Sequence, residues 1–138
     1  MIVVADTGAI VGLIDRSDRH HRQLRDLFAE RGQSWVLPWA ILPEVDYLVA
    51  AHLGARAEEA FLADLADGTF QVSWGEDGDM AAAARLLRKY RDLGLGLVDA
   101  VVIATATRLQ ADAIVTLDVR DFSAVKIPGS PELWPRDR

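Results

Sequence analysis

The stretch IVVADTGAIVGLI, residues 2–14, decides the fold because it passes from one kind of secondary structure to another at a single junction. Its opening residues, IVVA, form a short β-branched run of the kind found in fully buried strands. The residues that follow, TGAIVGLI, predict a helix that begins at the junction of Asp6 and Thr7. A buried strand that leads directly into a helix is the first half of a strand–helix–strand unit and indicates an α/β fold.

The same alternation continues along the chain. Short apolar runs predict further strands at residues 34–38, 69–74 and 113–117, with a short fifth strand, AVKIP, at 124–128. Helices are predicted at residues 17–32, 39–54, 55–68, 75–94 and 95–110, and the proline-punctuated tail from residue 129 is predicted to be non-helical. The pattern predicts a single domain over residues 1–138, a three-layer α/β/α sandwich with a central parallel sheet of about five strands.

Composition narrows the class of protein. With 51% hydrophobic and 26% charged residues the chain is globular, and the absence of cysteine excludes disulfides, thiolate metal sites and a cysteine nucleophile. The net charge of −6 argues against a simple basic nucleic-acid binder, but not against an acidic enzyme that carries metal ions. The sequence shows neither a signal peptide nor an apolar stretch of membrane-spanning length, so we expect a cytoplasmic protein without membrane contact.

Four carboxylates fall at equivalent places in the predicted fold. Asp6 and Asp118 end two of the strands, while Glu44 and Asp99 stand near the starts of two helices. In a parallel α/β fold, a strand ends at the same edge of the sheet at which the next helix begins, and ligands bind at that edge. We therefore expect these four side chains to lie together. Pro43, beside Glu44, is compatible with a helix only in its first turn, which leaves the start of that helix open.

Asp99 poses the sharpest question, since it stands at the head of the otherwise apolar run LGLVDAVVIATAT, residues 95–107. Burying an ionised carboxylate costs several kcal/mol unless something pairs with it. Asp99 and Asp6 could each simply cap a helix. Together with Glu44 and Asp118 they would instead repel one another unless a cation intervened. Clustered oxygen ligands suit Mg²⁺ or Mn²⁺, which support the attack of water on a phosphodiester.

The sequence resembles the PIN-domain ribonucleases, and within them the VapC-type toxins of bacterial toxin–antitoxin pairs. The segments VVADTGAIVGLID, LPEVDYLV, GLGLVDAVVIATA and IVTLDVRDF carry this resemblance, in the family's order and spacing over essentially the whole chain. The resemblance implies an endoribonuclease that depends on Mg²⁺ or Mn²⁺, an RNA substrate, a homodimer and inhibition by an antitoxin protein. It further implies the following roles: Asp6, Asp99 and Asp118 as metal ligands, Glu44 as a further catalytic acid, and Thr7 and Thr116 as hydroxyls beside the site.

Other polar residues have less specific interpretations. Asp121 is interpreted as a turn residue, with an outer position beside the metal as the alternative. Arg120 is a candidate contact for RNA phosphate, with a solvated surface position as the alternative. The same two interpretations hold for the basic run of Arg85, Arg88, Lys89 and Arg91. Surface or core positions without catalytic chemistry are expected for His20, His21, Asp46, Glu76, Asp77, Asp79 and the four tryptophans.

Three other functions fit a small acidic-edged α/β domain. A receiver-like signalling domain needs a phospho-acceptor Asp at the end of its third strand, and the run TFQVSW, residues 69–74, has none. An aspartyl phosphatase needs a second Asp two residues after Asp6, where Gly8 stands. A catalytically silent PIN fold that only binds RNA or protein would not need all four acids. These alternatives are therefore less favoured than the nuclease.

Overall fold

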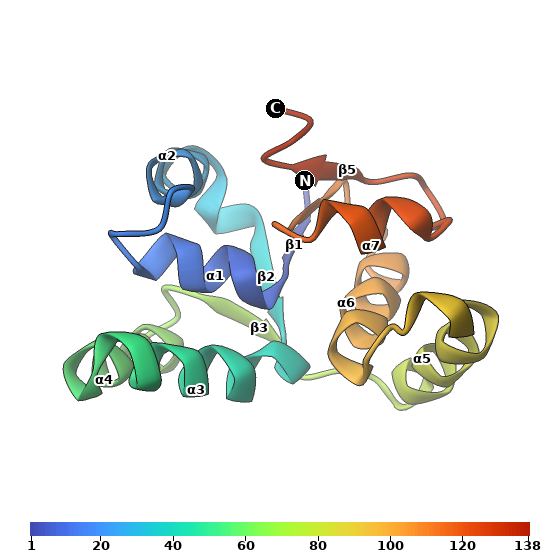
Figure 1. Cartoon of the computed structure of the whole chain (residues 1–138), viewed down its shortest axis with the longest axis horizontal. Helices are drawn as coiled ribbons and strands as arrows, with labels where there is room; N and C mark the ends of the chain where they lie inside the picture. Colours follow the sequence, from blue (N-terminus) through green and yellow to red (C-terminus); the bar gives the residue numbers. More distant parts are fainter.

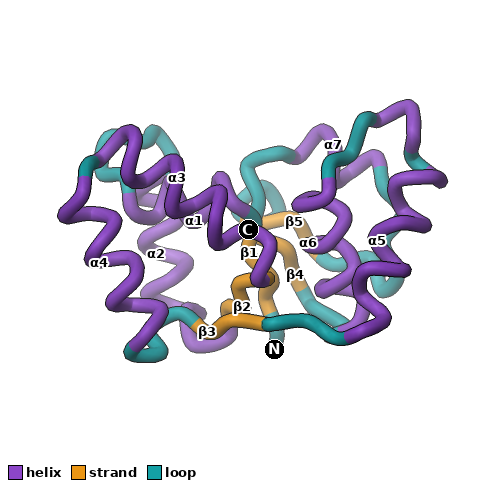
Figure 2. Tube along the Cα trace, turned by 90° about the horizontal axis from the view of Figure 1, so that it is seen from below, coloured by secondary structure: helices purple, strands orange, loops and turns teal.

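The computed structural model describes residues 1–138 and forms one parallel sheet between two layers of helices (Figures 1 and 2). The strand order is β3-β2-β1-β4-β5, and every neighbouring pair is parallel. This arrangement confirms the predicted sandwich of about five parallel strands. The strands are β1 (Val3–Ala5), β2 (Trp35–Pro38), β3 (Gln71–Ser73), β4 (Ala113–Val115) and β5 (Glu132–Trp134).

The helices divide between the two faces of the sheet, as the view in Figure 2 shows. One layer holds α1 (Thr7–Ile14), α2 (His21–Arg31), α3 (Leu42–Leu53) and α4 (Ala55–Ala66). The other layer holds α5 (Asp77–Lys89), α6 (Leu97–Arg108) and α7 (Val119–Ala124). Three short 3₁₀ turns complete the structure: η1 (Gly32–Ser34), η2 (Trp39–Ile41) and η3 (Arg91–Leu93). None of the helices combines the length and the apolar character that crossing a bilayer demands.

Helix α6 is the central helix of its layer. Residues 100–106 are all buried, and α6 packs against β1 and β2 on one side and against α5 on another. A helix enclosed in this way needs apolar or small side chains all round, which explains the continuous apolar run in its sequence. Its burial also holds the first turn, with Asp99, in a fixed position relative to the sheet.

The order of the strands creates a switch point between β1 and β4. The chain proceeds from β1 outward to β2 and β3 on one side, whereas β4 and β5 lie on the other. Ala5 pairs with Val115, and the N–H of Asp6 donates a hydrogen bond of 2.9 Å to the carbonyl of Val115. Asp6 and the residues after β4 therefore leave the sheet side by side, where parallel sheets bind their ligands.

The predicted fifth strand at residues 124–128 is wrong, because Ala124 ends α7, residues 125–128 are irregular and β5 lies in the tail. Val125 and Ile127 are buried while Lys126 between them is exposed, so the segment has the period-2 pattern of a strand without pairing with one. The position beside β4 belongs instead to β5, whose Leu133 and Trp134 are buried. The tail is non-helical, as predicted, but it contributes this edge strand.

Candidate metal centre

Asp6 lies at the switch point, with only 6% of its surface exposed. It is the N-cap of α1: one carboxylate oxygen, Oδ1, accepts a hydrogen bond of 2.8 Å from the N–H of Thr7. The other oxygen, Oδ2, accepts one of 2.9 Å from the hydroxyl of Thr116. Burial raises the pKa of Asp6, these hydrogen bonds oppose the rise, and the nearby charges of Asp118 and Glu44 add to it. Asp6 thus caps a helix and also belongs to an acidic cluster.

Glu44 reaches the same place from α3. It stands in the first turn of α3, where Pro43 is accommodated at the start of the helix and η2 precedes it. Its Oε1 accepts a hydrogen bond of 2.7 Å from the hydroxyl of Thr7. Each of the two predicted hydroxyls therefore holds one carboxylate, since Thr7 binds Glu44 and Thr116 binds Asp6.

Asp99 is not a helix cap. The N-cap of α6 is Gly96, and no side chain caps this helix. No protein group donates a hydrogen bond to the Asp99 carboxylate, although the residue is half-buried. Burial, followed by the charges of Asp6 and the other cluster carboxylates, raises the pKa of Asp99 to about 6. Of the two explanations for this residue, capping fails, and a cation remains the interaction that would offset its burial.

Asp118 and Asp121 complete the cluster from the segment after β4. Asp118 is the N-cap of α7, and its Oδ1 accepts a hydrogen bond of 3.3 Å from the N–H of Asp121. The N–H of Asp118 donates to the hydroxyl of Thr116 at 3.0 Å. Carboxylate oxygens of Asp99, Asp118 and Asp121 all lie within 4.8 Å of one another. Asp121, interpreted from the sequence as a turn residue, is therefore one of the three most closely grouped acids.

A signal for this arrangement exists in the sequence. The spacing of Asp118 and Asp121, with two residues between them, is that of a capping pair at the start of a helix. Such a pair predicts a helix that begins at residue 119, where α7 begins and where the apolar pattern alone predicts no helix. A helix beginning there places both acids in or next to its first turn, facing the same edge of the sheet.

The cluster has no counter-ion within the protein. All six ion pairs of the chain involve other acids, and Arg120 forms no ion pair although it stands between Asp118 and Asp121 in sequence. The donor set consists of hard carboxylate oxygens without histidine or cysteine, which is the set that Mg²⁺ and Mn²⁺ prefer. The residues present therefore fit a divalent cation. The cluster consists of Asp6, Glu44, Asp99, Asp118 and Asp121, called here the carboxylate cluster.

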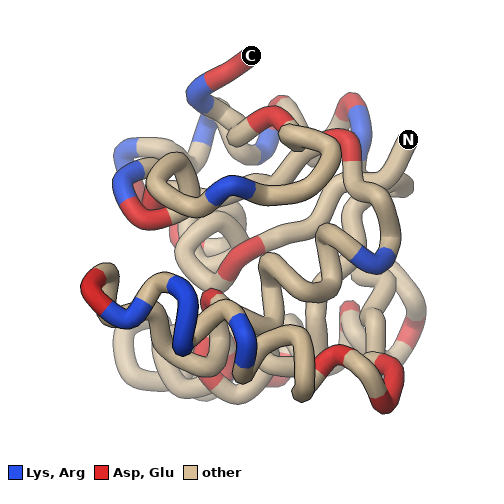
Figure 3. The backbone as a smooth tube through the Cα atoms, turned by 90° about the vertical axis from the view of Figure 1, so that its right-hand side faces the viewer, with Lys and Arg blue, Asp and Glu red and all other residues tan.

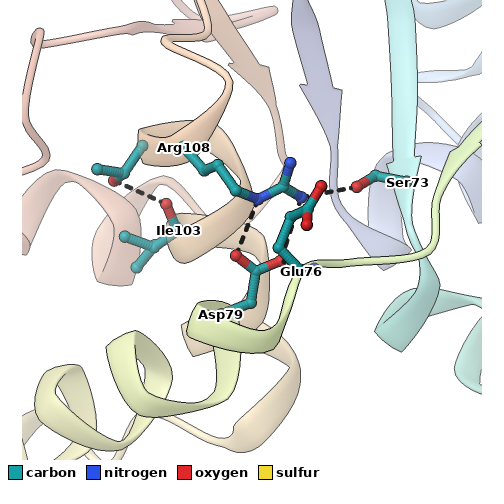
Figure 4. Close-up of polar contacts among 6 residues, drawn as sticks. Ser73, Glu76, Asp79, Ile103 and Arg108 are labelled. Atoms are coloured by element: carbon teal, nitrogen blue, oxygen red, sulfur yellow. Dashed lines mark hydrogen bonds and ion pairs between the residues drawn. The ribbon is translucent and has the colours of Figure 1, made fainter.

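One polar network, around Arg108, lies outside the carboxylate cluster and was not predicted from the sequence. Arg108, at the end of α6, donates two hydrogen bonds to Asp79 in the first turn of α5, at 2.8 and 3.1 Å, and one of 2.9 Å to Ser73 (Figure 4). Asp79 also takes part in a capping box with Glu76. Asp79 thus has the structural position predicted for it, together with an unexpected partner. The only feature of the sequence that points to Arg108 as this partner is its position as a cation in the last turn of the otherwise apolar helix α6.

The remaining sequence interpretations concern positions away from the cluster. Trp35 and Trp134 are buried in the core, whereas Trp74 is 75% exposed. His21 is half-buried rather than a plain surface residue, with its Nδ1 at 3.1 Å from the carbonyl of Gly12. Neither His20 nor His21 belongs to a group of potential metal ligands.

The fold and the cluster define a class: α/β/α proteins with an acidic centre, suited to a divalent cation, at the switch point of a parallel sheet. Comparison with known proteins identifies the family. The PIN domain matches residues 3–128, and the chain belongs to the PIN-domain family. The chain is 32% identical over 124 residues to Ribonuclease VapC26 of Mycobacterium tuberculosis, which covers 90% of this chain and 92% of that protein.

Solved structures share the fold. The crystal structure of VapC20 from Mycobacterium tuberculosis, described as a toxin that cleaves the sarcin–ricin loop, superposes with a TM-score of 0.80 at 20% identity, over 88% of this chain and 94% of that one. VapBC from Salmonella typhimurium, bound to DNA, gives a TM-score of 0.73 at 17% identity, over 96% of each chain. VapBC2 from Rickettsia felis, bound to promoter DNA, gives 0.70 at 18%, over 96% and 97%.

Proposed function

We propose that this chain is a metal-dependent endoribonuclease that hydrolyses RNA phosphodiesters and acts as the toxin of a toxin–antitoxin pair. The observation that carries the proposal is the carboxylate cluster, in which acids from four separate segments meet without a protein cation. A site of this kind has no evident purpose in folding, because the like charges repel one another. Membership of the PIN-domain family and the similarity to a relative named as a ribonuclease support the same conclusion.

The residues have distinct roles in this proposal. Asp6, Asp99 and Asp118 would hold Mg²⁺ or Mn²⁺, and Glu44 and Asp121 would complete the negative field around it. When bound, the cation would lower the pKa of a water for attack on the phosphodiester and stabilise the charge that develops on the phosphate. The hydroxyls of Thr7 and Thr116 fix the orientation of Glu44 and Asp6. Arg120 is exposed beside the cluster and is available to contact a phosphate.

The partners follow from the same proposal. The solved relatives named VapBC are complexes of two components, which supports an antitoxin as the partner that blocks this site. The homodimer and the cytoplasmic location expected from the sequence remain predictions. The receiver-like alternative is not favoured, because β3 ends at Ser73 without an acceptor Asp. Such a domain also needs a lysine at the end of its last strand, and Lys126 lies in an irregular segment before β5.

The proposal is tested by incubating partner-free protein with total bacterial RNA in the presence of Mg²⁺ or Mn²⁺. We expect a few discrete fragments, none of them formed with chelator or with Asp99→Asn or Asp6→Asn. Expression of the wild type should arrest growth, whereas both variants should be tolerated at equal protein levels. Cleavage that persists in both folded variants would show that the cluster is not the active site. A folded wild type that binds Mn²⁺ but cleaves no RNA would contradict the nuclease function itself.

A further inference from the structure

A groove of about 490 Å³ runs between α5 and α6, outside the carboxylate cluster. Its walls are largely aliphatic, with Ala82 and Leu86 from α5 and Ile103 and Ala104 from α6 among them, and Pro128 also contributes. Arg85 and Lys89 stand on its rim, while Glu76, Asp79 and Arg108 line its opposite end. The groove therefore combines an apolar interior with cations at one end and a largely neutralised ion pair at the other.

The cations on the rim belong to the most uniformly basic segment of the chain. Between residues 80 and 91 there are four Lys or Arg residues and no acid, in a protein whose net charge is −6. All four side chains are exposed and none forms an ion pair. Figure 3 shows this side of the molecule, with the Lys and Arg positions in blue. These four residues, Arg85, Arg88, Lys89 and Arg91, are called here the basic segment.

The groove and the carboxylate cluster lie along one face of α6. Asp99 and Ile103 are four residues apart, and Thr107 follows after four more, so all three lie on the same side of the helix. Ile103 is only about 6 Å further along the helix axis than Asp99. The groove therefore begins about one helical turn from the proposed site of cleavage.

The basic end of the groove is the end nearest the cluster. Helices α5 and α6 are antiparallel, because Arg108 at the end of α6 bonds Asp79 at the start of α5. Lys89, at the end of α5, therefore lies toward the Asp99 end of α6. The hydroxyl of Tyr90 accepts a hydrogen bond of 3.0 Å from the N–H of Lys126, which fixes this end of α5 against the segment after α7.

We propose that this groove binds single-stranded RNA next to the cleavage site, with a nucleobase between α5 and α6 and the adjoining phosphates on Arg85 and Lys89. The inference rests on the proposed nuclease function and extends it to the substrate's path. Single-stranded RNA suits the groove because its unstacked bases are flat and largely apolar while its backbone is anionic. Unpaired cations beside an apolar cleft meet both requirements, and the carboxylate at Glu76 directs the backbone to the basic end.

The phosphate contacts are tested with fluorescein-labelled, mixed-sequence single-stranded RNA, in chelator so that no cleavage occurs. Arg85→Gln/Lys89→Gln is compared with Arg22→Gln/Arg56→Gln, which removes two exposed, unpaired cations from the opposite helical layer. We expect the first pair to weaken binding about tenfold and to reduce the slope of log affinity against log salt by about 1.4, since each phosphate contact with a single strand contributes about 0.7. The control pair should leave both nearly unchanged. An equal effect of the two pairs, or no effect of either, would overturn the proposal.

The base contact is tested separately by filling the groove. Ala82→Leu places a larger side chain in the groove, whereas Ala81→Leu, its exposed neighbour, does not line it. We expect Ala82→Leu to weaken RNA binding about threefold without changing the salt slope, and Ala81→Leu to have no effect. An acidic amphipathic peptide that binds the groove, with RNA affinity unchanged in Arg85→Gln/Lys89→Gln, would overturn the proposal in favour of a protein ligand.

The two proposals can fail independently. Calorimetric Mn²⁺ binding should be the same in wild type and in all four groove and control variants, since none of these residues belongs to the carboxylate cluster. If Arg85→Gln/Lys89→Gln loses RNA affinity but the wild type never cleaves RNA, the nuclease function fails while the RNA path stands. If the wild type cleaves RNA but the groove variants bind and cleave it normally, the RNA path fails alone.

Discussion

Thr116 and Asp6 join the two strands that flank the switch point through one buried hydrogen bond of 2.9 Å, from the threonine hydroxyl to Oδ2 of the carboxylate. The same hydroxyl oxygen accepts the N–H of Asp118 at 3.0 Å. A single side chain thus fixes two members of the carboxylate cluster. Because it donates to the charged form of Asp6, it also lowers the pKa of that residue against the effect of burial.

Thr116→Val removes this hydroxyl while preserving the shape of the side chain. We expect Mn²⁺ affinity to fall about tenfold, because Asp6 loses its orientation and its pKa rises further. The free energy of unfolding should fall by about 1–2 kcal/mol, since a buried carboxylate oxygen is left without its donor. Thr116→Ser retains the hydroxyl and should recover most of both losses. Calorimetry and urea unfolding measure the two effects, and a valine variant with unchanged Mn²⁺ affinity would contradict the orienting role.

Asp99→Asn should stabilise the metal-free protein while abolishing metal binding. The pKa of Asp99 is raised to about 6 in the folded state, above its ordinary value of 3.8, so folding disfavours its charged form. Such a group contributes its stability below pH 4 and loses it as the pH rises through 6. At pH 7 in chelator, the variant should therefore be more stable than wild type by about 1 kcal/mol, after allowance for solvent screening of this half-buried group.

Urea unfolding at pH 4 and pH 7 checks this prediction. The difference between Asp99→Asn and wild type should be small at pH 4, where both side chains are neutral, and should grow toward pH 7. Asp77→Asn, at an exposed position in α5, serves as the control and should show no such growth. A difference that is the same at both pH values would mean that charge repulsion does not operate at Asp99.

The same pKa predicts how metal affinity depends on pH. A carboxylate binds a cation in its ionised form, and with a pKa of about 6 Asp99 is mostly ionised at pH 7 and mostly protonated at pH 5. Mn²⁺ affinity should therefore fall about tenfold between pH 7 and pH 5 from this residue alone. Calorimetry in two buffers of different ionisation enthalpy should show protons released on binding at pH 5. Binding without proton release at that pH would contradict the raised pKa.

The parts of the fold that were predictable are those in which local pattern and global packing agree. The apolar run that contains Asp99 indicated a buried helix, and the strand endings at Asp6 and Asp118 indicated their meeting at one edge. The strand predicted at residues 124–128 was wrong because two buried side chains there alternate with the exposed Lys126, and a loop packed on the core can produce the same pattern as a strand. The sequence signal for a strand in the tail is weak, because β5 is only three residues long and lies between two prolines.

The candidate site shows a similar division. Four of its acids could be assigned to one edge by topology alone, because that inference needs only the order of strands and helices. The position of the Thr7 and Thr116 hydroxyls beside the site came from the family resemblance, and their carboxylate partners came only from the structure, since no spacing in one sequence shows which hydroxyl meets which carboxylate. Asp79 and Arg108 are 29 positions apart in the sequence, and their ion pair depends on how α5 and α6 pack against each other. The local sequence around either residue therefore could not predict it.

The Asp79–Arg108 pair provides a prediction about stability that is independent of the carboxylate cluster. The Asp79 side chain is 9% exposed and that of Arg108 28%, so both charges are largely removed from water. The pair ties the start of α5 to the end of α6, and Ser73 extends it to β3. Asp79→Asn keeps the size of the side chain but leaves the guanidinium without its counter-charge. We expect the free energy of unfolding to fall by about 2–4 kcal/mol, because an uncompensated buried charge remains.

Asp77→Asn is the matched control, since Asp77 is an exposed acid in the same first turn of α5 and has no ion pair. Its loss should cost less than about 1 kcal/mol, the effect of one exposed charge on the helix dipole. Because Asp79 lies at the end of α5 remote from Asp99, folded Asp79→Asn should bind Mn²⁺ as the wild type does. Urea unfolding and calorimetry distinguish the outcomes. Equal destabilisation by the two variants would mean that the Asp79–Arg108 pair contributes no more than a surface ion pair. A loss of Mn²⁺ affinity in folded Asp79→Asn would show that α5 helps to position α6 for metal binding.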